Sequence, residues 1–155
     1  MARGFVWFAG LILLFGAIAA YELNYFNTFD TSNLPKAGLY HISLADVSLQ
    51  VTIARTPAEL QQGLSGTRSL PPNQGMLFVF PKADIYPFWM KDMQYPIDIL
   101  WIDEDGRIVY VAPNVSPDSY PATYKSSTPA LYILELNAGF AEAHSVRVGD
   151  TVHFQ

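Results

Sequence analysis

The chain has 155 residues, half of them apolar, which leaves material for one domain with a single hydrophobic core after an atypical N-terminus. It contains no cysteine, so disulfides, thiolate metal sites and thiol catalysis are excluded. Fourteen acidic residues outnumber nine basic ones, and the net charge of −5 disfavours binding to the phosphates of a nucleic acid.

An apolar segment near the N-terminus is the first feature along the chain. Residues 5–20 carry no charged or strongly polar side chain, follow Arg3, and end in Ala17-Ile18-Ala19-Ala20. Such a segment is either a signal peptide, cleaved after small residues of the A-x-A type, or a retained helical anchor, which needs about 20 apolar residues. A buried helix of a soluble core is disfavoured because the segment has no polar face.

Both interpretations give the rest of the chain the same location. Because Arg3 stays inside, we expect the domain to be membrane-anchored outside the cytoplasm, or secreted or periplasmic after cleavage. Residues 1–21 are thus the predicted signal peptide or N-terminal apolar anchor helix. Residues 22–38, which are rich in Asn, Thr and Ser, are a predicted linker. Residues 39–155 are the predicted domain.

The domain begins with two predicted strands, at residues 39–44 and 47–54. In the second of them, apolar and polar residues alternate, as in a strand with one buried face. A short helix follows, because Thr56 is a favourable N-cap and Glu59 completes a capping box. Gly63 suits the end of this helix.

The remainder of the domain reads as short strands separated by turns. Runs of apolar residues are bounded by Pro, Gly, Asn and Asp, and a Pro-rich loop is expected at 113–129. This spacing, with one short helix, indicates a mainly β fold, either a small antiparallel barrel or a sandwich. The further predicted strands are residues 76–80, 88–93, 97–103, 107–112, 130–136 and 151–154.

Two carboxylates fall on apolar faces of predicted strands. Asp98 shares a face with Leu100 and Ile102, and Glu135 shares a face with Ile133. A carboxylate on an apolar face must find a cation or hydrogen-bond donors, or else stay protonated. Both residues are therefore candidates for a functional site or for a structural polar network.

Three basic residues are candidate partners for these carboxylates: Arg55, Arg68 and Lys91. The functional interpretation is a constellation of Asp98, Glu135, Lys91 and Arg55 in a pocket with Phe88, Trp89 and Met90. The alternative is a buried network that fixes the register of the sheet, since perturbed carboxylates are enriched at sites but not confined to them. The three histidines show no spacing of metal ligands, so we expect no metal and no cofactor.

Several motifs occur in an order that is typical of a known family: residues 51–59, Gly63-Leu64, Arg68, residues 75–80, residues 88–91, residues 96–99, residues 134–139 and Gly149-Asp150. Over residues 40–155 the chain resembles the domain of unknown function 192 family of bacteria and archaea. The resemblance implies a compact, mostly β domain, often behind a signal peptide or anchor, and no established activity. Its pattern includes Met76, a further candidate for the lining of the pocket. It also includes the polar residues Arg55, Glu59, Arg68, Lys91, Asp98 and Glu135, which are candidates for a binding site or a structural network.

The chain departs from the family pattern at three places. Ser65 stands where a methionine usually follows Gly-Leu, and Gln61 stands near a position that is often basic. Asp92-Met93 stands where Asn-Thr often follows the lysine. If that Asn-Thr pair belongs to a site, the site is altered in this chain.

The first functional hypothesis is a non-enzymatic module of the cell envelope that binds a small ligand, a peptide or another envelope protein, and contacts the membrane through its N-terminal segment. The second is a hydrolase that uses Asp98 or Glu135 as general acid or base. The enzyme hypothesis requires both carboxyl groups to converge in one solvent-reachable cleft, so their placement separates the two hypotheses.

Overall fold

The computed structural model describes residues 38–155. The predicted signal peptide or anchor, and all but the last residue of the predicted linker, lie outside the described residues. Within residues 38–155, no helix is long and apolar enough to cross a membrane.

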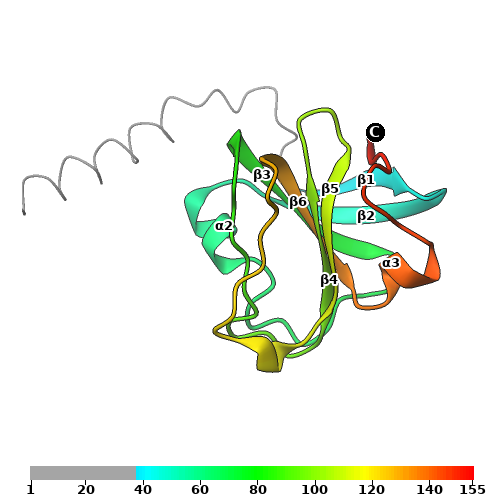
Figure 1. Cartoon of the computed structure of the whole chain (residues 1–155). Helices are drawn as coiled ribbons and strands as arrows, with labels where there is room; N and C mark the ends of the chain where they lie inside the picture. Colours follow the sequence, from blue (N-terminus) through cyan, green and yellow to red (C-terminus); the bar gives the residue numbers. More distant parts are fainter. Residues whose placement is uncertain (1–37) are drawn as a thin grey trace, which may run out of the picture. The chain divides into compact units, whose positions relative to one another are not determined.

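One mixed sheet of seven strands forms the domain, in the order β5-β4-β6-β3-β2-β1-β7. The sheet is strongly curled into a half-barrel, and short helices flank it (Figure 1). The mainly β class predicted from the sequence is therefore confirmed. The strands are β1 (Leu39–Leu44), β2 (Val47–Ala54), β3 (Gln74–Asp84), β4 (Ile97–Ile102), β5 (Ile108–Val115), β6 (Ala130–Asn137) and β7 (His153–Phe154), and the helices are α2 (Pro57–Gln62), the 3-10 helix η1 (Pro117–Ser119) and α3 (Phe140–Ala143).

The prediction of a purely antiparallel sheet is wrong at one pair of strands. β2 and β3 run parallel, with Val51 opposite Gly75 and Ile53 opposite Leu77. A tight turn can join only antiparallel strands, whereas parallel strands need a crossover of a dozen or more residues. Residues 55–73, which contain α2, supply that crossover.

The cap of α2 is formed as the sequence predicts. The Thr56 hydroxyl accepts a hydrogen bond from the Glu59 N–H at 3.3 Å, and Glu59 Oε2 accepts one from the Thr56 N–H at 2.9 Å. The backbone N–H groups of Thr56 and Arg55, which both donate to Glu59 Oε2, lower the pKa of Glu59. Gly63 closes the helix with φ +49°, and its N–H donates to the Glu59 carbonyl at 2.9 Å.

Two stretches of chain differ from their predicted structure. Residues 88–93 are not a strand: Phe88 forms a single bridge with Tyr124, and Asp92 takes a positive φ of 57° within a turn. The apolar composition of this stretch reflects packing of a loop, in which Met90 is buried in the core. The helix α3 was not expected, and it follows β6 directly.

Both faces of β4, which lies between β5 and β6, are buried at all six positions. Ile99 and Trp101 belong to a hydrophobic cluster on one face, together with Phe78 of β3 and Ile133 of β6. Leu60 of α2 packs against this cluster. α3 covers the opposite face of the sheet, so the two helices lie on opposite sides of it (Figure 1).

Candidate functional site

The two buried carboxylates lie on neighbouring strands but point to opposite faces of the sheet. In the antiparallel pairing of β4 with β6, Glu135 stands opposite Ile99, and Asp98 stands opposite Leu136. Residues that stand opposite each other share a face, and successive residues alternate between faces. The hydrolase hypothesis requires both carboxyl groups to converge in one cleft. This requirement is not met, so a mechanism that uses the two as a pair is excluded.

Asp98 is fully buried, and backbone groups satisfy both of its oxygens. Oδ1 accepts hydrogen bonds from the N–H groups of Asn114 at 2.8 Å and Gly139 at 3.2 Å, and Oδ2 accepts one from Ala141 at 2.8 Å. Such donors compensate for the loss of water around the carboxylate. Asp98 thus joins the end of β5 and the start of α3 to β4, which is a structural role.

Glu135 is buried to a similar degree but lacks such support. Its side chain is 4% exposed, and Oε2 has no hydrogen-bond partner among the described residues. Burial raises the pKa of Glu135 to about 8, so the side chain is mostly protonated at neutral pH. An unsatisfied buried oxygen is uncommon in a folded protein, which makes this side chain the focus of the candidate site.

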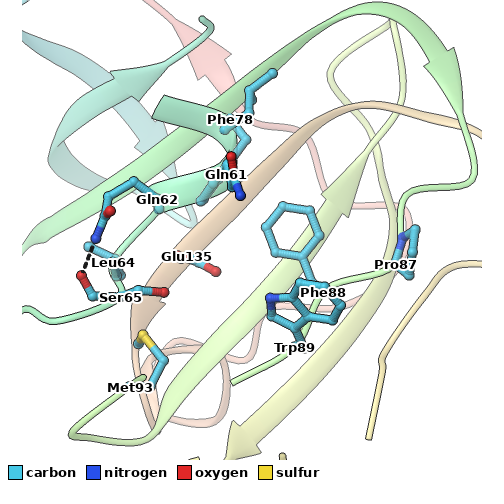
Figure 2. A pocket seen from close by; sticks show the side chains of 12 residues that line it. Gln61, Gln62, Leu64, Ser65, Phe78, Pro87, Phe88, Trp89, Met93 and Glu135 are labelled. Atoms are coloured by element: carbon cyan, nitrogen blue, oxygen red, sulfur yellow. Dashed lines mark hydrogen bonds between the residues drawn. The ribbon is translucent and has the colours of Figure 1, made fainter. Parts of the chain in front are cut away.

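The Glu135 carboxyl group faces a pocket of about 140 Å³ on the α2 side of the sheet. Figure 2 shows the carboxyl group between the segment that ends α2, on one side, and the aromatic side chains of Phe88 and Trp89, on the other. We call this space the Glu135 pocket. Its lining residues are Leu60, Gln61, Gln62, Gly63, Leu64, Ser65, Phe78, Pro87, Phe88, Trp89, Met93 and Glu135.

Two loops form the walls of the Glu135 pocket and are hydrogen-bonded to each other. Ser65 Oγ donates to the Lys91 carbonyl at 2.8 Å, and the Gly66 N–H donates to the Asp92 carbonyl at 2.9 Å. Because both bonds cross from the loop after α2 to the loop at 88–93, they hold the two walls together. The Ser65 hydroxyl is thereby committed to a structural contact.

Aromatic side chains form much of the pocket wall. Phe78 and Phe88 meet edge to face with their ring centroids 4.8 Å apart. Phe88 is held in place by a pair of 2.8 Å backbone hydrogen bonds with Tyr124. Trp89 stands at the rim, 54% exposed, with its ring edge-to-face against Tyr120 at 6.5 Å. The wall is therefore rigid near the sheet and open to solvent at Trp89.

A second hollow of about 560 Å³ adjoins the Glu135 pocket. The two share Gln61, Gln62, Ser65 and Trp89 in their linings. The second hollow also contains Lys91 and Asp92, together with Ala58 and Gly66. It provides a polar surface next to the mainly apolar Glu135 pocket.

The model of the DUF192 family, described as "Uncharacterized ACR", matches residues 40–154. The chain belongs to the DUF192 family. No curated protein matches it.

Two solved structures resemble this DUF192 domain. One is a protein from Sinorhizobium meliloti 1021 described as a "putative transcription regulator", which is 34% identical with a TM-score of 0.72, over 77% of this chain and 96% of that one. The other is a protein of unknown function from Novosphingobium aromaticivorans DSM 12444, with 24% identity and a TM-score of 0.71, over 82% of this chain and 99% of that one. The second likeness shows the fold alone.

The six polar residues singled out from the sequence do not form one network in the DUF192 domain. Glu59 belongs to the cap of α2, and the side chains of Arg68 and Lys91 are exposed. No hydrogen bond or ion pair of residues 38–155 joins Arg68 or Lys91 to Asp98 or Glu135. The sequence identified the buried carboxylates, but not their partners.

The predicted pocket residues are partly in place. Phe88 and Trp89 line the Glu135 pocket, whereas Met90 is 1% exposed and belongs to the core. Met76 stands directly opposite Glu135 across the β3–β6 pair. The segment after α2 was not expected in a site. In this segment the departure from the family pattern at Ser65 was the sequence signal. The other two departures that line the pocket are Gln61 in α2 and Met93 in the loop at 88–93.

Proposed function

We propose that this DUF192 domain is a binding module that receives one group of a ligand in the Glu135 pocket. The observation that carries the proposal is the buried Oε2 atom of Glu135, which faces the pocket without a partner. Leaving a buried polar group without a hydrogen bond costs about 1–3 kcal/mol. A ligand that completes this hydrogen bond recovers the cost on binding.

The volume of the pocket limits what enters it. Its 140 Å³ is close to the roughly 150 Å³ of an engineered cavity that binds benzene, and below the roughly 300–1,000 Å³ of sites for whole drug-sized ligands. One side-chain-sized group therefore fits beside Glu135. The rest of the ligand lies in the second hollow, against Lys91 and Asp92.

We further propose that the domain acts outside the cytoplasm, tethered to the membrane or released from it. The support is the apolar run at 5–20 that follows Arg3. A small envelope compound, a peptide or another envelope protein is then the natural source of the ligand. The net charge of −5 disfavours a nucleic acid as the partner. Cell fractionation followed by N-terminal sequencing tests this location and distinguishes an anchor from a cleaved signal.

A thermal-shift screen of the full chain against small compounds and peptides tests the binding proposal. We expect at least one compound to raise the midpoint of unfolding, and Glu135→Leu to remove that rise. Trp89→Ala should weaken it, because it removes the rim of the pocket. Leu39→Ala is the matched control, since Leu39 is as exposed as Trp89 (56% against 54%) and lies on β1.

Two results would count against a binding role for this pocket. One is a screen in which no compound stabilises the chain. The other is stabilisation that is the same in the unaltered chain, in Glu135→Leu and in Trp89→Ala, because such a ligand binds elsewhere.

A further inference from the structure

We infer that the group received by the Glu135 pocket is an alkylammonium, carried either by a small amine or by a lysine side chain. The inference rests on the proposed binding function and adds the chemical class of the ligand. Three features of the pocket support it: the charges that line it, its aromatic wall, and the shape of its apolar part.

The lining of the pocket contains a carboxyl group and no cation. Among its twelve lining residues, Glu135 is the one acidic side chain, and none is lysine, arginine or histidine. An anionic ligand would therefore find no positive partner in the pocket. A cationic ligand meets no like charge and supplies the donor that Oε2 lacks.

The aromatic wall favours the same class of ligand. Phe78, Phe88 and Trp89 line the pocket together with the carboxyl group. Aromatic rings attract cations through their negative faces, and this attraction is larger where the cation has lost its water. A carboxylate combined with aromatic rings is therefore suited to an ammonium group.

The apolar lining accommodates an unbranched carbon chain. Leu60, Leu64 and Met93 line the pocket, and the polar residues Gln61 and Ser65 line both the pocket and the second hollow. An alkyl stem can thus bury its methylene groups while its charged end reaches Glu135. In a peptide ligand, the backbone on either side of the lysine would lie along the second hollow.

Binding of an ammonium must displace the proton of Glu135. In the empty pocket burial raises the pKa of Glu135 to about 8, and a bound cation lowers it. Below about pH 8 the affinity for an amine should therefore rise about tenfold for each pH unit. A neutral ligand that accepts a hydrogen bond from the protonated carboxyl instead binds with nearly constant affinity below about pH 8 and more weakly above it.

Groups near Glu135 do not produce this pH dependence themselves. On the adjacent strands its cross-strand neighbours are Met76 and Ile99, and α2 contributes the uncharged Gln61 and Gln62 to the pocket. Tyr95 has its pKa raised by burial and by the charge of Glu135, so it stays protonated in this range. Lys91 and Asp92 line the second hollow and not the Glu135 pocket.

Titration calorimetry with the full chain at pH 6, 7 and 8 tests the inference. The probes are n-butylamine, its neutral analogue 1-butanol and the anion butyrate. We expect butylamine to bind best, with an affinity that increases about tenfold from pH 6 to pH 7 and with release of about one proton. Glu135→Gln should weaken amine binding at least tenfold and abolish the pH dependence. Glu142→Gln, which removes an exposed carboxylate of α3 on the opposite face of the sheet, should preserve both the binding and its pH dependence.

Two further probes separate the sources of the ammonium. The first is Nα-acetyl-lysine-methylamide. If it binds more tightly than butylamine, the natural ligand is a lysine side chain of a polypeptide, because the backbone then adds contacts in the second hollow. Equal or weaker binding identifies a free amine. The Nε-acetylated form of the same compound should lose binding, since it has no charge.

The inference and the proposed function fail in different ways. If butanol or butyrate binds in the pocket as well as butylamine does, and Glu135→Leu abolishes that binding, the binding function stands and the ammonium inference is overturned. Amine affinity that is independent of pH, or unchanged in Glu135→Gln, also overturns it. If no probe binds, and the wider thermal-shift screen finds no ligand, both are overturned. An unfolding midpoint of Glu135→Gln close to that of the unaltered chain shows that a loss of binding does not come from loss of the fold.

Discussion

Asp98 and Glu135 lie on adjacent strands with their side chains on opposite faces of one sheet. The first accepts three backbone hydrogen bonds, whereas an oxygen of the second has no partner within the described domain. Two carboxylates that are almost equally buried thus have opposite energetic roles. This contrast can be measured, because matched substitutions should affect stability at one position and not at the other.

Asp98→Asn should lower the free energy of unfolding by about 3 kcal/mol. The amide offers one acceptor oxygen in place of two, and its NH₂ group would face a backbone N–H that already needs an acceptor. Urea denaturation followed by circular dichroism measures the change. A loss below about 1 kcal/mol would show that the three hydrogen bonds contribute little.

Glu135→Leu should leave the free energy of unfolding at pH 7 unchanged or raise it by about 1–2 kcal/mol. The substitution replaces an unsatisfied carboxyl group with an apolar side chain in a mainly apolar environment. The same urea titration applies, with Asp98→Asn as the contrasting variant. A destabilisation as large as that of Asp98→Asn would identify Glu135 as a structural residue.

The stability of the chain should depend on pH through Glu135. Its pKa is raised from 4.5 to about 8 in the folded chain, so the folded state holds a proton that the unfolded state has lost between these values. The contribution of the Glu135 carboxyl group to the free energy of unfolding is therefore largest below about pH 4.5. It decreases by about 3–5 kcal/mol in total as the pH rises to about 8.

The variant Glu135→Gln isolates this contribution from the titration of other groups. The difference in unfolding free energy between the chain and this variant should fall with pH and level off above about pH 8. Urea denaturation at pH 5, 6, 7 and 8 measures it. A difference that stays constant over this range would contradict the raised pKa.

Gly63→Ala should destabilise the chain by about 1–3 kcal/mol and disturb the pocket. At this position φ is +49°, and an added Cβ would lie 3.0 Å from Cζ of Phe78, which lines the pocket. Gly66→Ala is a matched control, because Gly66 also has a positive φ but an added Cβ meets nothing within 4 Å. Equal losses in the two variants would assign the effect to backbone strain alone.

Local signals in the sequence predicted local structure well. β1 and β2 begin and end at the predicted residues, because strict alternation and a short turn define such a hairpin. The capping box of α2 involves only neighbours along the chain, and it is also as predicted. In contrast, the parallel pairing of β2 with β3 depends on the path of a long connection, which periodicity does not reveal.

For the candidate site, the sequence located the buried acids but not their surroundings. Alternation placed Asp98 and Glu135 on buried faces, and both are buried. Whether two residues on different strands share a face depends on the register between the strands. A common cleft would require Asp98 to stand opposite Glu135, but Asp98 stands opposite the next residue, Leu136. The sequence did not predict α3 because the helix has only four residues. In addition, the N–H groups at its start bind Asp98, which is distant in the sequence, so no local capping signal marks the helix.

The position of β6 in the sheet has a consequence for how the pocket recognises its ligand. β6 is hydrogen-bonded along both edges, to β3 and to β4, so the backbone of Glu135 cannot move without breaking two ladders at once. The amide of Glu135 should accordingly be among the slowest to exchange with deuterium. The carboxyl group is then preorganised, and a ligand that fits it loses little free energy to ordering the protein.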